Sequence, residues 1–191
     1  MTRFKTVAVV AALGAFAAVI LAGTSGAAPG GRLRTFGTGE VITANNSATI
    51  VIDVGEFGGV FQQGKGQSGQ LLGDVTFAFT SRGDVAGGAP RFSIPIDDGS
   101  FDPNSDYALI DAAGCGATVG DNPTGTATFV STQNPQCHVN FHGVDYLNWA
   151  TFASSNPTFR IAKNTAFIIA DAVPPSHVSA TFVVTDIALT P

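Results

Sequence analysis

Short segments in which every second residue is apolar recur along most of the chain. From Thr49 to Val54 the repeated residues are Ile and Val, and from Val75 to Thr80 they are Val and Phe. Because successive side chains of a strand point to opposite faces, this period of two predicts strands with one buried face. The pattern recurs in Phe92–Ile96, Val139–Phe141 and Phe159–Ile161. We expect the alternating Phe, Ile and Val side chains to form the core.

Turn-forming residues separate these segments. Two asparagines in the stretch Ala44–Ser47 separate Glu40–Thr43 from Thr49–Val54, and Asn tolerates positive φ, so a hairpin is predicted. Further strands are predicted at four segments: Tyr107–Ala112, Thr126–Val130, Ala166–Asp171 and Ser179–Leu189. About nine or ten strands are typical of an all-β fold, here an antiparallel β-sandwich of the jelly-roll or immunoglobulin-like type.

Two segments depart from the alternating pattern. The stretch 146–154 follows Asp145, a favourable N-cap, and stops before a proline, so it predicts one short helix. Tyr146, Trp149, Ala150 and Ala153 would share a face of that helix and close one end of the sandwich. The segment Gly58–Gly73 is rich in Gly and Gln and predicts a flexible surface loop.

The N-terminus has the layout of a secretory signal peptide. A basic start, an apolar run and a small-residue stretch predict a signal peptide over residues 1–27, cleaved after Ala27. The alternative is a retained membrane anchor, because the apolar run is close to the shortest that spans a bilayer. The remaining residues, 28–191, have the size of one domain. We expect this domain to be secreted, extracellular or associated with the cell envelope, without a membrane span.

The charge of the chain argues against nucleic-acid binding. Loss of Arg3 and Lys5 with the signal peptide leaves seven basic residues against 14 acidic ones, so the net charge changes from −5 to −7. Nucleic-acid-binding proteins instead cluster Lys and Arg. The segment Gly59–Gly66 resembles a phosphate-binding loop, but Gly66 stands where that motif has Ser or Thr, so nucleotide binding is not expected.

Cys115 and Cys137 are the two cysteines of the chain. In an oxidising compartment an even number favours a disulfide, which contributes roughly 3 kcal/mol in the chain-entropy model. The alternative is two buried free thiols. A zinc site or catalytic cysteine would need His or further Cys at ligand spacing, which the sequence lacks.

The densest group of oxygen donors lies between Asp97 and Asp106. Asp102, Asn104 and Asp106 are spaced like the first ligands of an EF-hand calcium loop, so the sequence suggests a calcium site there. The similarity ends at Tyr107, where that loop has Gly. A solvated acidic turn is the alternative. No other cofactor is expected.

Catalytic residues are not evident. Glu40 and Glu56 are poorly placed for glycoside hydrolysis, which leaves a pair of Asp residues as the alternative. For Ser–His–Asp chemistry, no histidine has an evident partner. His138 and His142 would share a strand face but lie too far apart for one metal.

Among the aromatic residues, alternating Phe is expected in the core, and Tyr107 and Tyr146 remain as candidates for stacking on a sugar. We therefore predict a monomeric, non-catalytic extracellular domain for binding, adhesion or envelope association, with a glycan or another cell-surface component as ligand. A carbohydrate-binding module or a secreted hydrolase acting on glycans is the alternative.

Overall fold

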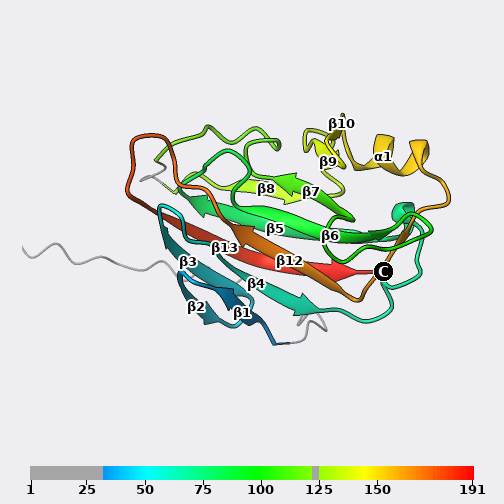
Figure 1. Ribbon diagram of the computed structural model, residues 1–191, viewed down its shortest axis with the longest axis horizontal. Coiled ribbons are helices and arrows are strands. Elements are labelled where there is room, and N and C mark those ends of the chain that lie inside the picture. Colours follow the sequence, from blue (N-terminus) through cyan, green and yellow to red (C-terminus); the bar gives the residue numbers. More distant parts are fainter. Residues whose placement is uncertain (1–31, 122–124) are drawn as a thin grey trace, which may run out of the picture.

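A computed structural model describes residues 32–121 and 125–191 as two antiparallel sheets that pack against each other (Figure 1). The larger sheet has eight strands. Seven of them lie side by side in the order β1 (Arg34–Gly37), β4 (Gly58–Gln63), β12 (Thr165–Ala170), β6 (Arg91–Asp97), β7 (Tyr107–Asp111), β9 (Val139–Phe141) and β10 (Val144–Tyr146). The eighth, β11 (Arg160–Ile161), pairs with the end of β6. The predicted signal peptide, residues 1–27, lies outside the described residues.

The smaller sheet has five strands and covers the inner face of the larger one. Its order is β2 (Glu40–Ala44), β3 (Ser47–Asp53), β13 (Ser179–Thr190), β5 (Thr76–Gly83) and β8 (Thr128–Ser131). The predicted hairpin joins β2 to β3, and Asn45 in its turn has a φ of 52°. The prediction of an antiparallel β-sandwich is confirmed.

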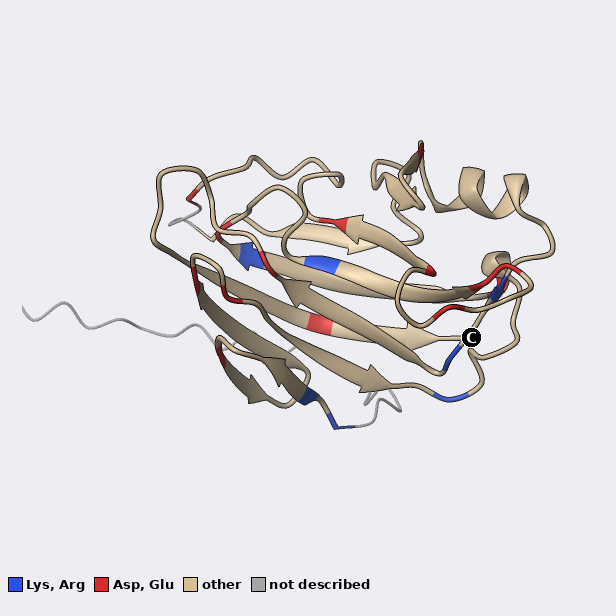
Figure 2. Cartoon of the chain, in the orientation of Figure 1, with Lys and Arg blue, Asp and Glu red and all other residues tan. Residues whose placement is uncertain are grey.

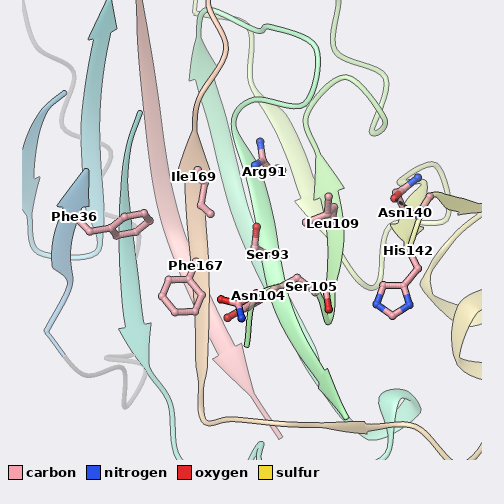
Figure 3. Close-up of a pocket in the computed structure, with 12 residues that line it drawn as sticks. Phe36, Arg91, Ser93, Asn104, Ser105, Leu109, Asn140, His142, Phe167 and Ile169 are labelled. Carbon is pink, nitrogen blue, oxygen red and sulfur yellow. Dashed lines mark hydrogen bonds between the residues drawn. The ribbon is translucent and has the colours of Figure 1, made fainter. Parts of the chain in front are cut away.

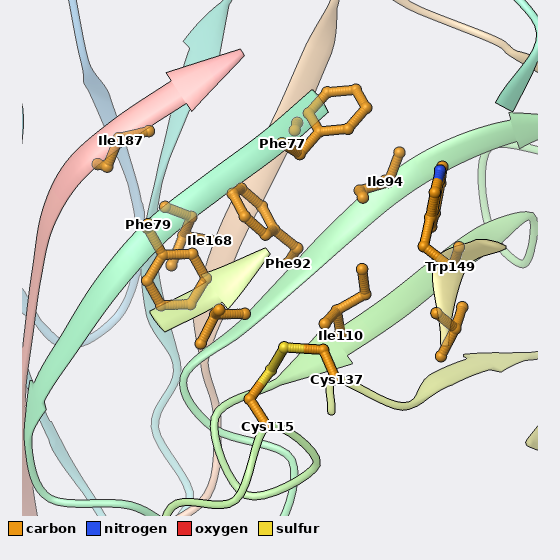
Figure 4. Close-up of a cluster of buried hydrophobic side chains, with 14 of the residues drawn as sticks. Phe77, Phe79, Phe92, Ile94, Ile110, Cys115, Cys137, Trp149, Ile168 and Ile187 are labelled. Carbon is orange, nitrogen blue, oxygen red and sulfur yellow. A yellow bond between two sulfur atoms is a disulfide. The ribbon is translucent and has the colours of Figure 1, made fainter. Parts of the chain in front are cut away.

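The core lies between the two sheets (Figure 4). Phe77 and Phe79 from β5 contact Phe92 from β6, with ring centroids 6.2 and 4.7 Å apart. These rings come from the alternating positions that the sequence predicts to be buried. Val54, also predicted in the core, is 69 % exposed, because β3 ends at Asp53 and the chain turns there.

The helix is shorter than predicted and begins later. Helix α1 spans Trp149–Ser155, and Asn148 rather than Asp145 caps it by accepting a hydrogen bond from the backbone N–H of Thr151. Its buried residues are Trp149 and Phe152, whereas Ala150 is exposed. The Trp149 indole donates to the carbonyl of Leu72 (2.7 Å) in the short 3-10 helix η1 (Leu72–Asp74), so α1 closes one end of the core.

Part of the segment predicted as a flexible loop is a strand. Residues Gly58–Gln63 form β4, which pairs with β1 on one side and β12 on the other. Glycine normally weakens a strand, but here two neighbouring strands fix its backbone. The segment that resembles a phosphate-binding loop therefore begins inside a sheet and leads into no helix of the kind that binds phosphate.

The predicted disulfide between Cys115 and Cys137 is present, with the two Cα atoms 3.9 Å apart. It joins the segment after β7 to the segment before β9, and both cysteines are buried. Within the described residues, no helix is long and apolar enough to cross a membrane.

Candidate ligand-binding site

A pocket of about 540 Å³ opens on the outer face of the larger sheet, opposite the core (Figure 3). Its apolar lining comes from five side chains: Phe36, Tyr107, Leu109, Phe167 and Ile169. Its polar lining comes from six: Arg91, Ser93, Asn104, Ser105, Asn140 and His142. Such a mixture, mainly apolar with a few polar groups, is typical of sites for small ligands.

The strand register brings distant residues into rows across this face. Phe61, Phe167, Ser93, Leu109 and Asn140 are successive cross-strand partners on β4, β12, β6, β7 and β9. Residues that pair across a ladder project to the same face of a sheet. These five side chains therefore share the outer face, while their neighbours along each strand enter the core.

An aromatic cluster forms one side of the pocket. The rings of Phe36, Phe61 and Phe167 lie 5.7 to 6.4 Å apart, and Tyr107 contacts Phe167 at 6.1 Å. All four residues are half-buried. Neighbouring rings keep one another in place, so the cluster presents a preformed apolar surface.

Two polar side chains, Asn140 and His142, lie on the side opposite Phe36, and Asn104 and Ser105 lie between Phe167 and His142 (Figure 3). The amide of Asn140 donates to Asp145 (2.6 Å) and accepts from the backbone N–H of Gly143 (3.2 Å). An amide has two N–H groups and two acceptor positions, so Asn140 can also bind a ligand. Asn104 and Ser105 reach the pocket from the loop between β6 and β7.

His142 has an acidic partner that the sequence did not reveal. Its Nε2 lies 2.8 Å from Oδ1 of Asp106, whose side chain is only 7 % exposed. The ring also stacks on Phe141, with centroids 4.0 Å apart. The backbone N–H of Asp102 lowers the pKa of Asp106 below its ordinary value of 3.8; burial opposes this, and hydrogen bonds from His142 and Ser105 reinforce it. Asp106 is therefore ionised and accepts the proton of Nε2.

The cationic side chain in the pocket is also paired. Arg91 forms a two-pronged ion pair with Asp171, in which Nη2 lies 2.6 Å from Oδ2, and Nη1 also donates to the carbonyl of Gly88. A two-pronged pair fixes the guanidinium plane and satisfies its charge. In Figure 2 the Lys and Arg positions of the described chain are spread over several elements rather than gathered at one face.

Tyr107 has the properties of a hydrogen-bond donor. Burial raises the pKa of its hydroxyl above the ordinary value of 10.0, and the nearby carboxylate of Asp102 acts in the same direction. The hydroxyl therefore stays protonated across the physiological range. Tyr107 was one of the two residues expected to be available for a ligand. The other, Tyr146, packs on Phe152 at 5.0 Å and is not among the residues that line the pocket.

The three residues of the suggested calcium site already use their side chains in hydrogen bonds. Oδ1 of Asp102 accepts from the backbone N–H of Asn104 (2.9 Å), and Asp106 accepts from Asp102 and His142. In residues 32–121 and 125–191, no group of three or more His, Cys, Asp or Glu side chains is arranged to hold a metal ion. Calcium binding at Asp102, Asn104 and Asp106 stays a prediction.

The remaining catalytic candidates do not come together. Glu40 lies on the edge strand β2, and Glu56 accepts from the backbone N–H of Asp53 (3.1 Å). His177 pairs with Asp121 at 2.9 Å, away from the pocket lining. Comparison of the chain with protein-family models, curated proteins and solved structures gives no match.

Proposed function

We propose that this domain binds carbohydrate without catalysis, outside the cytoplasm, and holds a neutral saccharide in the pocket on the outer face of the larger sheet. The observation that carries the proposal is the two-sided pocket: aromatic rings on one side, and hydrogen-bonding side chains on the other, with the cation Arg91 already paired with Asp171. The buried disulfide is compatible with an oxidising compartment.

A sugar ring matches these two sides chemically. One face of a pyranose carries C–H groups of weakly positive character, which are attracted to the negative face of an aromatic ring. Its hydroxyl groups both donate and accept, as do the side chains of Asn104, Ser105 and Asn140. A purely apolar ligand would shield the remaining donor and acceptor positions of these side chains from water without bonding to them, at a cost in free energy.

The charges in the pocket favour a neutral ligand. Arg91 is paired with Asp171, and His142 with Asp106. A charged ligand would have to compete with these existing pairs, whereas a hydroxyl group can bond to their remaining donor and acceptor positions. Recognition through hydrogen bonds without net charge is what a neutral glycan requires.

One observation favours a second candidate function, hydrolysis of a glycan. His142 and Asp106 form a His–acid pair at the pocket, and the Ser105 hydroxyl lies 3.1 Å from carboxylate oxygens of both Asp106 and Asp102. However, the pKa of Asp106 is lowered, whereas a glycosidase acid needs a raised pKa. The Ser105 hydroxyl is bonded to carboxylates and not to the His142 imidazole, so a serine nucleophile is not supported. We therefore favour binding.

A glycan array followed by titration calorimetry tests the proposal. Tyr107→Ala should weaken binding of the best array ligand about tenfold, because it removes one stacking ring from the pocket. Tyr107→Phe keeps the ring and should lose only the contribution of the hydroxyl. Asn140→Ala should also weaken binding, through the polar side of the pocket.

Phe129→Ala is the matched control. Phe129 is 52 % exposed on β8 of the smaller sheet, so its removal should leave affinity unchanged. Melting curves of each variant check that it is folded. Absence of any array ligand for the wild-type protein would overturn the proposal, and release of reducing sugar from a bound glycan, lost in His142→Ala, would replace it by the hydrolase.

A further inference from the structure

The line of aromatic rings continues beyond the pocket. Phe36 and Phe167 are 5.9 Å apart, Phe167 and Tyr107 are 6.1 Å apart, and Tyr107 and Phe101 are 6.3 Å apart. Phe101 lies in the segment between β6 and β7 and does not line the pocket. The line therefore begins on the edge strand β1, runs across the larger sheet and ends outside the cavity.

The three steps between neighbouring rings are nearly equal, and each is comparable to the length of one sugar unit. The four rings lie over the outer face of one sheet, neighbouring rings of the four meet at interplanar angles of 73 to 86°, and Phe61 packs beside them against Phe36 and Phe167. Phe36, Phe101, Tyr107 and Phe167 are all half-buried, so each keeps part of its surface open to a ligand. Because the four rings extend over three such steps, a chain of sugars has more of this surface to contact than a single sugar has.

The loop that carries Phe101 is held by its own acidic residues. The carboxylate of Asp97 accepts from the backbone N–H of Gly99 (2.9 Å), that of Asp98 from Ser100 (3.2 Å), and that of Asp102 from Asn104 (2.9 Å). These short-range bonds surround Phe101 on both sides in the sequence. A platform that is already ordered lowers the entropic cost of binding.

A polar group marks the outer end of the line. The ammonium group of Lys163 lies 4.8 Å from the centroid of the Phe101 ring. An exposed ammonium has three N–H donors, so it can bond to hydroxyls of a sugar unit placed beside the ring. The outer end thus combines an aromatic ring with a donor, as the pocket does.

We propose that the ligand is an extended, unbranched oligosaccharide of at least three sugar units, which crosses the strands from Phe36 to a second subsite formed by Phe101 and Lys163. This inference rests on the proposed carbohydrate binding. It adds the chain length of the ligand and its direction across the sheet.

Calorimetric titration with a series of neutral oligosaccharides tests the inference. The probes are one to six units of the repeat that binds best on the glycan array. Affinity should rise with each added unit until the subsite at Phe101 is filled. Phe101→Ala should reduce affinity for the longest member about tenfold, while affinity for the single sugar unit stays as in the wild-type protein. Lys163→Ala should act in the same direction with a smaller effect.

The outcomes separate the inference from the proposed function. Equal affinity for one unit and for six units would overturn the extended site while leaving the pocket as a sugar site. An equal loss for short and long probes in Phe101→Ala would do the same. Failure of every probe to bind would remove both. Phe129→Ala, on the other sheet, should match the wild-type protein throughout the series.

Discussion

Gly59 on β4 gives the ring of Phe36 its place over the sheet. A Cβ atom at position 59 would come within 2.5 Å of Cζ of Phe36 and would also clash with the backbone carbonyl of Ile168 on β12. Real Cβ contacts are not that short, so a side chain at position 59 must displace both the aromatic ring and the neighbouring strand. Gly59 lies inside β4, between β1 and β12, so the absence of a side chain here is required by the packing of the sheet and of Phe36 and not by a turn.

Gly59→Ala should therefore reduce stability and affinity together. We expect a loss of about 1–3 kcal/mol in the free energy of unfolding, as for other overpacked positions, and weaker binding because Phe36 is displaced. Gly73→Ala is the matched control, because its Cβ atom would meet nothing within 4 Å. Chemical denaturation and calorimetry measure the two effects. Unchanged stability and affinity in Gly59→Ala would contradict the packing described here.

Asp106 makes the stability of the site depend on pH. Its pKa is lowered in the folded state, first by the backbone N–H of Asp102 and also by His142 and Ser105. A carboxyl group with a lowered pKa stabilises the fold fully above its unfolded pKa, and this contribution disappears as the pH falls through the folded pKa. The bonds between Asp106, its loop and His142 should therefore weaken only under strongly acidic conditions.

Asp106→Asn should show this dependence directly. At neutral pH the variant should be less stable than the wild-type protein, because an amide oxygen is a weaker acceptor than a carboxylate for the backbone N–H of Asp102 and for His142. The difference should shrink as the pH falls below the ordinary value of 3.8, where the wild-type carboxyl group also becomes neutral. Denaturation curves measured across this range provide the comparison. A difference that stays constant with pH would count against an ionised Asp106. The control is Asp98→Asn, which replaces an exposed carboxylate of the same loop and should have nearly the stability of the wild-type protein at every pH.

At the scale of elements, the sequence predicts where strands lie better than which face of a strand is buried. In β3 and β5 the period of two identifies buried Ile and Phe correctly. In β12 both faces are apolar: Ala166 and Ile168 enter the core, while Phe167 and Ile169 line the pocket. The expectation that alternating Phe is buried in the core is thus wrong for Phe167. An apolar run without alternation is the available signal, because it is typical of strands that are covered on both faces.

The polar side of the pocket depends on contacts that local patterns cannot predict. β9 has only three residues, and it joins the sheet through the pairing of Asn140 with Leu109 on β7. That pairing brings His142 to Asp106, although 36 positions separate them in the chain. His142 also has a φ of 52°, so it leaves the strand instead of continuing the face of His138. The prediction that Asp145 caps the helix is wrong for a related reason. Asp145 lies in β10, so the helix begins only after Asn148.

For the whole molecule, the disulfide connects the two segments that supply polar side chains to the pocket. Asn104 and Ser105 precede β7, and Asn140 and His142 lie on or directly after β9. Cys115 follows β7, Cys137 precedes β9, and the backbone N–H of His138 donates to the carbonyl of Gly114 (3.1 Å) beside the bridge. The bond therefore restrains the unfolded chain in the region where long-range pairing forms the pocket. Neither cysteine lines the pocket itself.

Removal of the disulfide should accordingly affect stability more than binding. The double variant Cys115→Ala, Cys137→Ala should lose about 2–4 kcal/mol in the free energy of unfolding, while its folded fraction keeps the affinity of the wild-type protein for the array ligand. Denaturation with and without reductant measures the first effect, and reductant should lower the stability of the wild-type protein but not that of the variant. Equal stability of the two proteins would show that the bridge adds nothing to the fold. A folded variant that no longer binds would show that the bridge positions β9 and Asn140, and hence that the pocket is less preformed than its contacts indicate.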